Sequence, residues 1–322
     1  ENLIGGRLCP PADGSYLPSI NPATGEQLCL VPLSGPEDLE QAVQAAKAAF
    51  PAWRDMAVEE RAEVMNRLAD LLEENLTELI RAEVLDNGMT WSFASSVEVP
   101  RGAQNLRAFA KAALDFCRPR TFSQPHARGY VRHQPVGVLG TITPWNLPLL
   151  SLTWKIAPAL AAGNCVVAKP SEVTPVTAYL LSTLVEKAGF PPGVLNILHG
   201  TGPGIGSLLT RHKDVLRLSF TGSTATGRLI GMACAEEFKK PPLLEMGGKN
   251  PSIVFADARL EDAADCVSRA AFSNQGQGCF SGSRIYLEKS IYEPFKKMLL
   301  ERVEGYKPQD PLQESTRHGA TV

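Results

Sequence analysis

The chain has 322 residues, of which 44% are hydrophobic and 20% charged, which suits about two globular domains and excludes a disordered chain. Its formal net charge of -2 gives no electrostatic basis for a nucleic-acid partner. No apolar run reaches the length of a membrane span, and the N-terminus ENLIGGRLCP lacks the layout of a signal peptide, so neither a membrane location nor secretion is expected.

The first part of the chain, residues 1–119, is predicted to be helical after a short extended segment. Ser34 is the expected cap of a first helix. Residues 59–85 carry apolar side chains at helical spacing, which predicts one long amphipathic helix, and a third helix is expected over residues 100–116. These helices carry no obvious chemistry, so we expect them to be the scaffold of a cofactor-binding domain.

The segment RPRTFSQP ends this helical part, and residues 120–139 are predicted to form a boundary with an extended arm. In residues 140–246 short apolar strands alternate with helices. This alternation predicts the α/β class, with right-handed crossovers and a doubly wound parallel sheet that is covered by helices on both faces. Ligands of such sheets bind at the carboxyl ends of the strands, so the chemistry is expected just after each strand.

Residues 247–322 are predicted to begin a second α/β domain, since a strand, a helix and another strand follow in this order. The sequence ends in a polar tail without clear periodicity.

The seven cysteines form an odd set without a C-x-x-C pair. This pattern argues against a disulfide framework and against a zinc site, and no metal site is expected. It fits a reducing compartment, so the expected location is cytoplasmic.

The first polar stretch after a strand is TPWNLP. The side chain of Asn146 offers an uncharged N–H donor that suits an oxyanion. The alternative is that Asn146 only caps a turn.

The second stretch is AKPSE, in which Lys169 ends a strand and Glu172 follows three residues later. Both side chains suit the hydroxyls of a ribose, and the carboxylate of Glu172 would repel a 2′-phosphate. The alternative is an exposed ion pair at the start of a helix.

Two glycine-containing stretches follow. In FTGSTATG, a strand leads through Ser223 into a helix, whose free N–H groups suit a phosphate; no Gly-Lys-Ser/Thr follows, which excludes a P-loop. The run GTGPGIG includes Gly202, a candidate for cofactor binding. This run lacks the wider spacing of a dinucleotide fingerprint and is expected to be a loop that leads into a helix.

The last pair of stretches is LLEMGGKNP and FSNQGQGCF. Glycines on both sides of Gln277 let the loop expose the thiol of Cys279, and Glu245, ahead of Gly247, is a candidate base. Glu245 lies between Leu244 and Met246, which argues against the alternative of a surface glutamate. The alternative for Cys279 is an incidental cysteine in a loop.

In this order the stretches resemble the NAD(P)-dependent aldehyde dehydrogenase superfamily. The resemblance rests on PWN, KPSE, FTGS, LEMGGKNP and NQGQGC, flanked by INPATGE, TWKIAPALAAGN and GFPPGVLNILHG. It covers residues 4–306, after which the tail departs from the pattern. It also implies that the chain is shortened at its C-terminus, because no E-x-F-G-P motif is present, and that the domain begun at residue 247 is an incomplete catalytic domain. An incomplete domain is expected to expose apolar surface and to leave sheet edges unpaired.

The resemblance implies oxidation of a small-molecule aldehyde to a carboxylic acid. The thiolate of Cys279 would attack the aldehyde and form a thiohemiacetal, whose oxyanion Asn146 and the Cys279 N–H would hold. After hydride transfer, Glu245 would activate the water that hydrolyses the thioester.

The resemblance also implies the cofactor. Lys169 and Glu172 would hold the adenosine ribose and Ser223 the pyrophosphate, and the charge of Glu172 favours NAD over NADP. The other residues that the resemblance places at the cofactor are Thr143, Pro144, Trp145, Gly202 and Gly247. Family members form homo-oligomers, which is not the expectation for a shortened chain.

The segments VEVPRGAQNLRAFA and PWNLPLLSLTWK look most like the branch that oxidises muconic semialdehydes, such as 2-aminomuconic 6-semialdehyde. These substrates carry a carboxylate, and Arg101 is a candidate partner for it. The alternative is that Arg101 is an ordinary arginine at a helix start.

Two other functions remain open. One is a catalytically inactive shortened form that binds a full-length relative. The other is a thiol esterase that uses Cys279 without a cofactor, which the Lys169, Glu172 and Ser223 stretches argue against.

Overall fold

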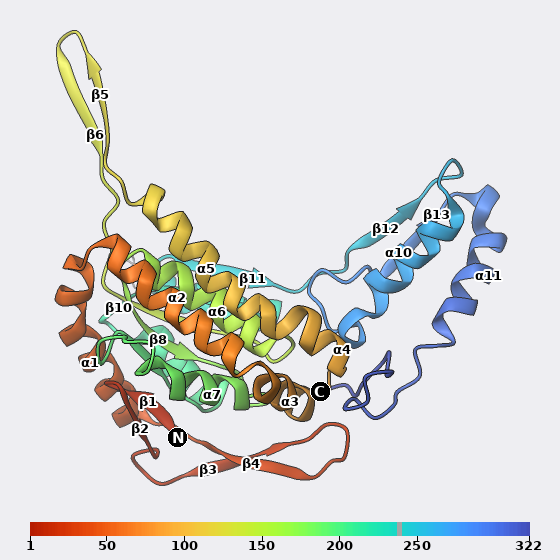
Figure 1. Ribbon diagram of the computed structural model, residues 1–322, viewed down its shortest axis with the longest axis horizontal. Coiled ribbons are helices and arrows are strands. Elements are labelled where there is room, and N and C mark those ends of the chain that lie inside the picture. Colours follow the sequence, from red (N-terminus) through yellow and green to blue (C-terminus); the bar gives the residue numbers. More distant parts are fainter. Residues whose placement is uncertain (237–239) are drawn as a thin grey trace.

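The computed structural model describes residues 1–236 and 240–322, which are built around one seven-stranded sheet (Figure 1). Its strands are β1 (Asn2–Ile4), β2 (Arg7–Cys9), β7 (Val138–Ile142), β8 (Cys165–Lys169), β9 (Leu195–Ile197), β10 (Val215–Gly222) and β11 (Pro242–Met246). Their order is β11-β10-β7-β8-β9-β1-β2. The five strands from β11 to β9 run parallel, and β1 is antiparallel to both β9 and β2.

Helices cover this sheet. They are α1 (Pro36–Asp55), α2 (Val58–Glu74), α3 (Leu76–Asn87), α4 (Trp91–Phe93), α5 (Val99–Phe116), α6 (Pro148–Ala161), α7 (Val176–Val185), α8 (Ser207–Arg211) and α9 (Thr224–Glu236), with the short turns η1 (Ala94–Glu98) and η2 (Gly202–Gly206). The connections through α6 and α7 lead from β7 to β8 and from β8 to β9, both in one direction across the sheet. The connection through α8 leads from β9 back to β10, on the other side of β7. Right-handed crossovers therefore put α8 on the opposite face, where it contacts α1 and α9. The predicted doubly wound α/β sheet is confirmed.

The sheet is buried because both faces are covered. All five residues of β8 and all three of β9 are buried, as expected for central parallel strands. The large core extends from the sheet into the helices, where its largest fully buried side chain is Trp53, whose Nε1–H donates to the carbonyl of Leu160.

Two helix predictions need correction. The predicted long helix over residues 59–85 is two helices, since the chain turns at Asn75, whose side-chain Nδ2 donates to the carbonyl of Leu71 over 2.7 Å. Ser34 does not cap α1. Instead the carboxylate of Asp38 accepts from the N–H of Gly35 over 2.8 Å, while the hydroxyl of Ser34 donates to Asn2.

A second, smaller hydrophobic core lies in the C-terminal part. It joins a two-stranded parallel sheet to two helices; the elements are β12 (Pro251–Val254), α10 (Leu260–Phe272), η3 (Ser273–Gly276), β13 (Arg284–Leu287), η4 (Lys289–Ile291) and α11 (Tyr292–Val303). Phe295 is fully buried at its centre. Leu243, Ile253 and Phe255 are each at least 60% exposed on β11 and around β12, which confirms the expected exposed apolar surface.

Two hairpins complete the fold. One joins β3 (Tyr16–Ile20) to β4 (Gln27–Pro32), and the other joins β5 (Arg120–Gln124) to β6 (Ala127–Val131). Figure 1 shows the second hairpin projecting away from the body, within the predicted extended arm. The boundaries of the predicted domains stay a prediction. Within the described ranges, no helix combines the length and apolar character of a membrane span.

Candidate active site

The strand order reverses between β7 and β10, and the segments that follow these strands carry the predicted site. The chain continues from β7 into Thr143, from β8 into the AKPSE turn, from β10 into Ser223 and from β11 into Gly247. In an open α/β sheet this reversal point is where ligands bind.

Cys279 lies in the loop after η3, with an exposed side chain. Its carbonyl accepts from the side-chain Nδ2 of Asn250 over 2.8 Å. A Cβ added at Gly248 would lie 2.6 Å from the same carbonyl, so only glycine permits this approach. The segment after β11 therefore packs directly against the cysteine.

Asn146 is joined to the cysteine loop by two hydrogen bonds. Its side-chain Nδ2 donates to the carbonyl of Gln277 over 2.7 Å, and its backbone carbonyl accepts from Nδ2 of Asn274 over 2.8 Å. The structure thus brings Asn146 to the loop that carries Cys279, although the two are far apart in the sequence. Because the Asn146 amide carries two hydrogens, one donor remains for an oxyanion.

Hydrogen bonds to the backbone hold the stretch that leads to Asn146. The carbonyl of Trp145 accepts from Nδ2 of Asn87 over 2.7 Å and from the hydroxyl of Thr174 over 3.3 Å. The N–H of Thr143 donates to the carbonyl of Lys169 over 3.1 Å. Pro144, Trp145 and Asn146 are half-buried, so this stretch forms a wall of the site.

Two fully buried carboxyl groups cap α6, which starts directly after this wall. Glu83 accepts from the N–H of Leu149 over 3.2 Å, and Glu98 accepts from the N–H of Leu150 over 2.9 Å. Burial, reinforced by the charge of Glu98, raises the pKa of Glu83 well above its ordinary value. Burial also raises the pKa of Glu98 to about 8, against the hydrogen bonds from the helix N–H groups.

Glu245 lies on β11 at the edge of the sheet and is exposed. The prediction that its apolar neighbours would enclose it is wrong, because Met246 is itself 40% exposed at this edge. Lys155 of α6 is buried, and its Nζ donates to the hydroxyl of Ser219 over 3.0 Å. Burial lowers the pKa of Lys155 to about 8, and the charge of Glu245 acts in the opposite direction.

Lys169 and Glu172 form an ion pair with 2.5 Å between Nζ and Oε2. The Lys169 side chain is 3% exposed, so the alternative of an exposed ion pair is wrong. The other oxygen of Glu172 accepts from the N–H of Gly202 over 3.1 Å. Burial by itself raises the pKa of Glu172, but the charge of Lys169 and these hydrogen bonds outweigh it, so the pKa of Glu172 is lowered.

A cavity of about 450 Å³ lies next to this ion pair, between η2–α8 and α9, with Ile142 at its side. Gly202 and Pro203 line one wall, and Leu229 and Ile230 line the other. The prediction that GTGPGIG leads into a helix is confirmed, since η2 continues into α8.

Ser223 precedes α9, and its hydroxyl oxygen accepts from the N–H of Thr226 over 3.1 Å. Three features here match the parts of a dinucleotide. The apolar cavity of about 450 Å³ suits a purine, the carboxylate of Glu172 suits a ribose, and the N-terminus of α9 suits a phosphate. The residues present therefore fit the adenosine and phosphate parts of a dinucleotide.

Arg101 is exposed in the first turn of α5. Among the described residues it makes no ion pair. A Cβ added at its neighbour Gly102 would lie 3.0 Å from Leu149, so this turn packs on the start of α6, close to Asn146 in the chain.

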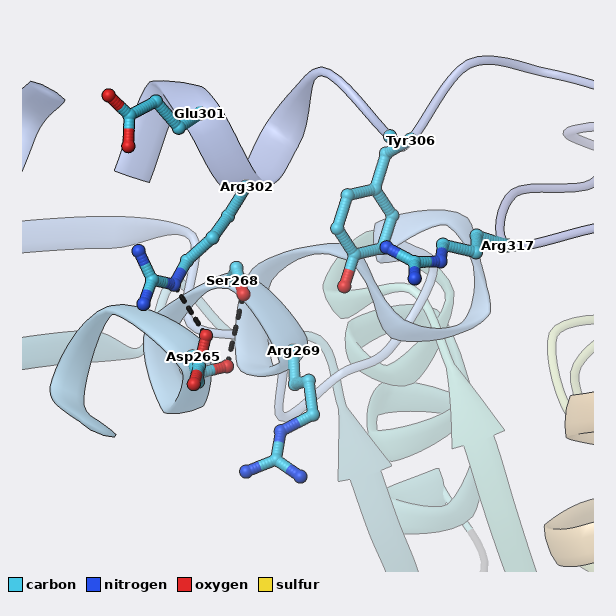
Figure 2. Close-up of a pocket in the computed structure, with 8 residues that line it drawn as sticks. Asp265, Ser268, Arg269, Glu301, Arg302, Tyr306 and Arg317 are labelled. Carbon is cyan, nitrogen blue, oxygen red and sulfur yellow. Dashed lines mark hydrogen bonds and ion pairs between the residues drawn. The ribbon is translucent and has the colours of Figure 1, made fainter. Parts of the chain in front are cut away.

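A separate groove of about 500 Å³ lies between α10, α11 and the C-terminal segment. Figure 2 shows that Arg302 forms an ion pair with Asp265 and that the hydroxyl of Ser268 donates to the backbone carbonyl of Asp265. The groove contains none of the predicted site residues. In the part of the chain that the structure describes, no cluster of His, Cys, Asp or Glu is arranged to hold a metal.

Four side chains of the site were not singled out from the sequence: Glu83, Glu98, Lys155 and Asn274. A charged side chain on the apolar side of a helix is a usable signal for the first three, because each is buried. Asn274 stands in the quoted NQGQGC stretch, but the sequence does not show that its amide reaches Asn146.

The comparisons with known proteins identify the family of the chain. The sequence model described as "Aldehyde dehydrogenase family" matches residues 10–322. The predicted end of the resemblance at Tyr306 is therefore wrong, since the match includes the tail. A 2-aminomuconic semialdehyde dehydrogenase of Danio rerio is 48% identical over 325 residues, which cover 100% of this chain and 66% of that protein.

Two solved structures resemble the fold closely. An indole-3-acetaldehyde dehydrogenase complexed with NAD+ has a TM-score of 0.96 at 40% identity, covering 99% of this chain and 65% of its own. An NAD+ complex of an aldehyde dehydrogenase from Bacillus cereus has a TM-score of 0.97 at 36% identity, covering 100% and 66%. The chain thus spans about two thirds of the length of the relatives it matches.

Proposed function

The chain belongs to the aldehyde dehydrogenase family, and from this premise we propose that the protein oxidises an aldehyde to a carboxylic acid with NAD, with Cys279 as the nucleophile. The observation that carries the proposal is the pair of hydrogen bonds between Asn146 and the loop of Cys279. They hold an uncharged donor beside an exposed thiol, which is the arrangement that acyl chemistry on sulfur requires.

In the first step the Sγ of Cys279 attacks the carbonyl carbon, a C–S bond forms, and the carbonyl electron pair moves to oxygen. The remaining N–H of the Asn146 amide and the Cys279 backbone N–H donate to this oxyanion. Bound NAD supplies the acceptor for the hydride that leaves the same carbon. The product of this step is a thioester on Cys279.

In the second step water hydrolyses the thioester and releases the carboxylic acid and the thiol. Glu245, exposed at the end of β11, is the proposed base that takes the proton of this water. The buried Lys155 lies near enough for the charge of Glu245 to act on it, which adds a cationic neighbour to the proposed base.

The residues proposed to hold NAD follow from the site. Leu229 and Ile230 on one side and Pro203 on the other would enclose the adenine ring. Glu172, kept ionised by Lys169, would accept from the ribose hydroxyls, and the start of α9 after Ser223 would donate to the pyrophosphate. The rest of the proposed NAD site would be lined by Thr143, Pro144, Trp145, Gly202 and Gly247.

The test is NADH formation from NAD and a panel of aldehydes, followed by absorbance, with NAD binding measured by calorimetry. We expect Cys279→Ala to abolish NADH formation while NAD still binds. Cys266→Ala, at the other exposed cysteine, is the matched control and should keep full activity. Binding without any turnover in the unsubstituted protein would favour an inactive form, and ester cleavage without NAD would favour the thiol esterase.

The proposed substrate is an aldehyde that also carries a carboxylate, such as 2-aminomuconic semialdehyde. The name of the Danio rerio relative supports this class. Arg101 supports it too, because its exposed side chain stands on the turn of α5 that packs on the start of α6 and makes no ion pair among the described residues. An unpaired guanidinium suits a carboxylate in a bidentate contact.

We therefore expect Arg101→Ala to raise the KM for a carboxylated aldehyde roughly ten- to a hundredfold, since a hydrogen bond to a charged group is lost. The KM for a neutral aldehyde of similar size should change little. Arg81→Ala, an exposed arginine on α3, serves as the control. An equal rise for both aldehydes would remove Arg101 from the proposal.

The proposed location is the cytoplasm. It rests on the seven cysteines, which are all free in the structure and thus fit a reducing compartment. Fractionation of cells that express the tagged protein would test it, and recovery in an oxidising compartment would contradict it.

A further inference from the structure

Asn274 is a buried amide that links the two halves of the candidate active site. Its side chain is 7% exposed, and its Nδ2 donates to the carbonyl of Asn146 over 2.8 Å. In return Asn146 donates to the carbonyl of Gln277, whose N–H donates to the carbonyl of Asn274 over 2.9 Å. The three hydrogen bonds close a ring through both loops.

The backbone at this position is unusual. Asn274 has φ 50° and ψ 44°, and Gln275 has φ 56° and ψ 24°. Both lie in the left-handed region, which is unfavourable for a residue with a Cβ and which glycine adopts freely. Asparagine and glycine both tolerate this region, so the turn alone does not select asparagine over glycine at position 274. The contact of its amide with Asn146 does.

We propose that Asn274 is a positioning residue for the oxyanion-binding amide of Asn146. This inference rests on the proposed function, which assigns the oxyanion to Asn146. The side chain of Asn274 donates to the backbone carbonyl of Asn146, and the carbonyl of Gln277 accepts one of the two Nδ2 hydrogens of the Asn146 side chain. The amide plane then has one orientation, and its second hydrogen is free for an oxygen bound at Cys279, two residues beyond Gln277.

The decisive variant is Asn274→Gly, which keeps the left-handed turn and removes only the amide. We expect kcat to fall roughly ten- to a hundredfold, because a misplacement of about 1 Å near the reacting atoms has an effect of this size. The KM for NAD should stay unchanged. Asn274→Asp, which keeps the shape but loses the donor, should lower kcat at least as much. A glycine variant with the kcat of the unsubstituted protein would overturn the proposal.

A second comparison separates positioning from a general structural role. In an Asn146→Ala background, Asn274→Gly should lower kcat no further, because the residue through which it acts is already gone. If Asn274→Gly lowers kcat by the same factor in both backgrounds, Asn274 acts independently of Asn146 and the proposal is wrong.

A readout without turnover keeps the two proposals distinct. If the unsubstituted protein oxidises no aldehyde, the proposed function fails, and crystal structures of the unsubstituted and Asn274→Gly proteins still test the positioning role. We expect the 2.7 Å contact between Asn146 and Gln277 to be lost or displaced in the variant. An unchanged contact would overturn the inference.

Discussion

Both oxygens of the Glu172 carboxylate are engaged, one by Lys169 and the other by the N–H of Gly202. A side chain held in this way cannot swing aside for a larger ligand without breaking two hydrogen bonds. Its charge therefore stays where the 2′ position of a bound adenosine is proposed to lie.

At this residue we expect Glu172→Gln to lower the preference for NAD over NADP, measured as the ratio of the two kcat/KM values, by about tenfold, because a carboxylate that repels the 2′-phosphate is removed. Glu186→Gln, exposed after α7, is the control and should leave the ratio unchanged. A ratio that stays the same in both variants would contradict the proposed role.

At the scale of an element, α6 begins on two buried carboxyl groups, so its position depends on their protonation. Glu83 also accepts from the hydroxyl of Thr177, and Asp86 of α3, whose pKa burial raises to about 7, lies near the pair. A buried acid with a raised pKa binds its proton in the folded state at a pH where the unfolded chain has released it. Stability is therefore expected to fall as the pH rises from about 5 to about 8.

We expect Glu98→Gln to flatten this dependence. The amide still accepts from Leu150 but has no proton to lose, so the slope of the unfolding free energy between pH 5 and pH 8 should become shallower by up to ~1.4 kcal/mol per pH unit. Urea denaturation at several pH values measures the slope. Glu74→Gln, exposed on α2, should leave it unchanged, and an unaltered slope in Glu98→Gln would contradict the expectation.

Elements also show where prediction from sequence stops. The strands are predictable because the local pattern of apolar residues indicates them. The roles of Cys279, Asn146 and Glu172 stay predictions, which rest on the residues around each of them. The break at Asn75 was not predicted, because the apolar spacing continues across it. In the structure both the side-chain Nδ2 and the N–H of Asn75 donate to the carbonyl of Leu71 at this break. The exposure of Glu245 depends on β11 being a sheet edge, which is a property of strand order and not of the letters around it.

At the scale of the whole molecule, the cysteine loop and the C-terminal segment both contact Gly88, the left-handed cap of α3 with φ 77°. Its carbonyl accepts from the side-chain Nε2 of Gln275 and from the N–H of Ala320, both over 2.9 Å. A Cβ at this position would lie 2.8 Å from Pro22 and 2.9 Å from Ala320. One backbone carbonyl thus joins α3, the cysteine loop and the C-terminal segment.

Gly88→Ala should lower the free energy of unfolding by about 2–4 kcal/mol, since it adds both backbone strain and overpacking. Gly25→Ala is the matched control: Gly25 has φ 73° but nothing within 4 Å of the added Cβ, so it should cost only ~1–2 kcal/mol. Equal losses in the two variants would show that packing at the junction contributes nothing.

The exposed apolar wall of the cavity between α8 and α9 has a consequence for the heat of ligand binding. Leu229 and Met232 on its α9 wall are 66% and 58% exposed, so a planar purine seated there would remove apolar side chains from water. Dehydration of apolar surface lowers the heat capacity. Nucleotide association should accordingly release more heat with each degree of warming, even where its affinity hardly changes.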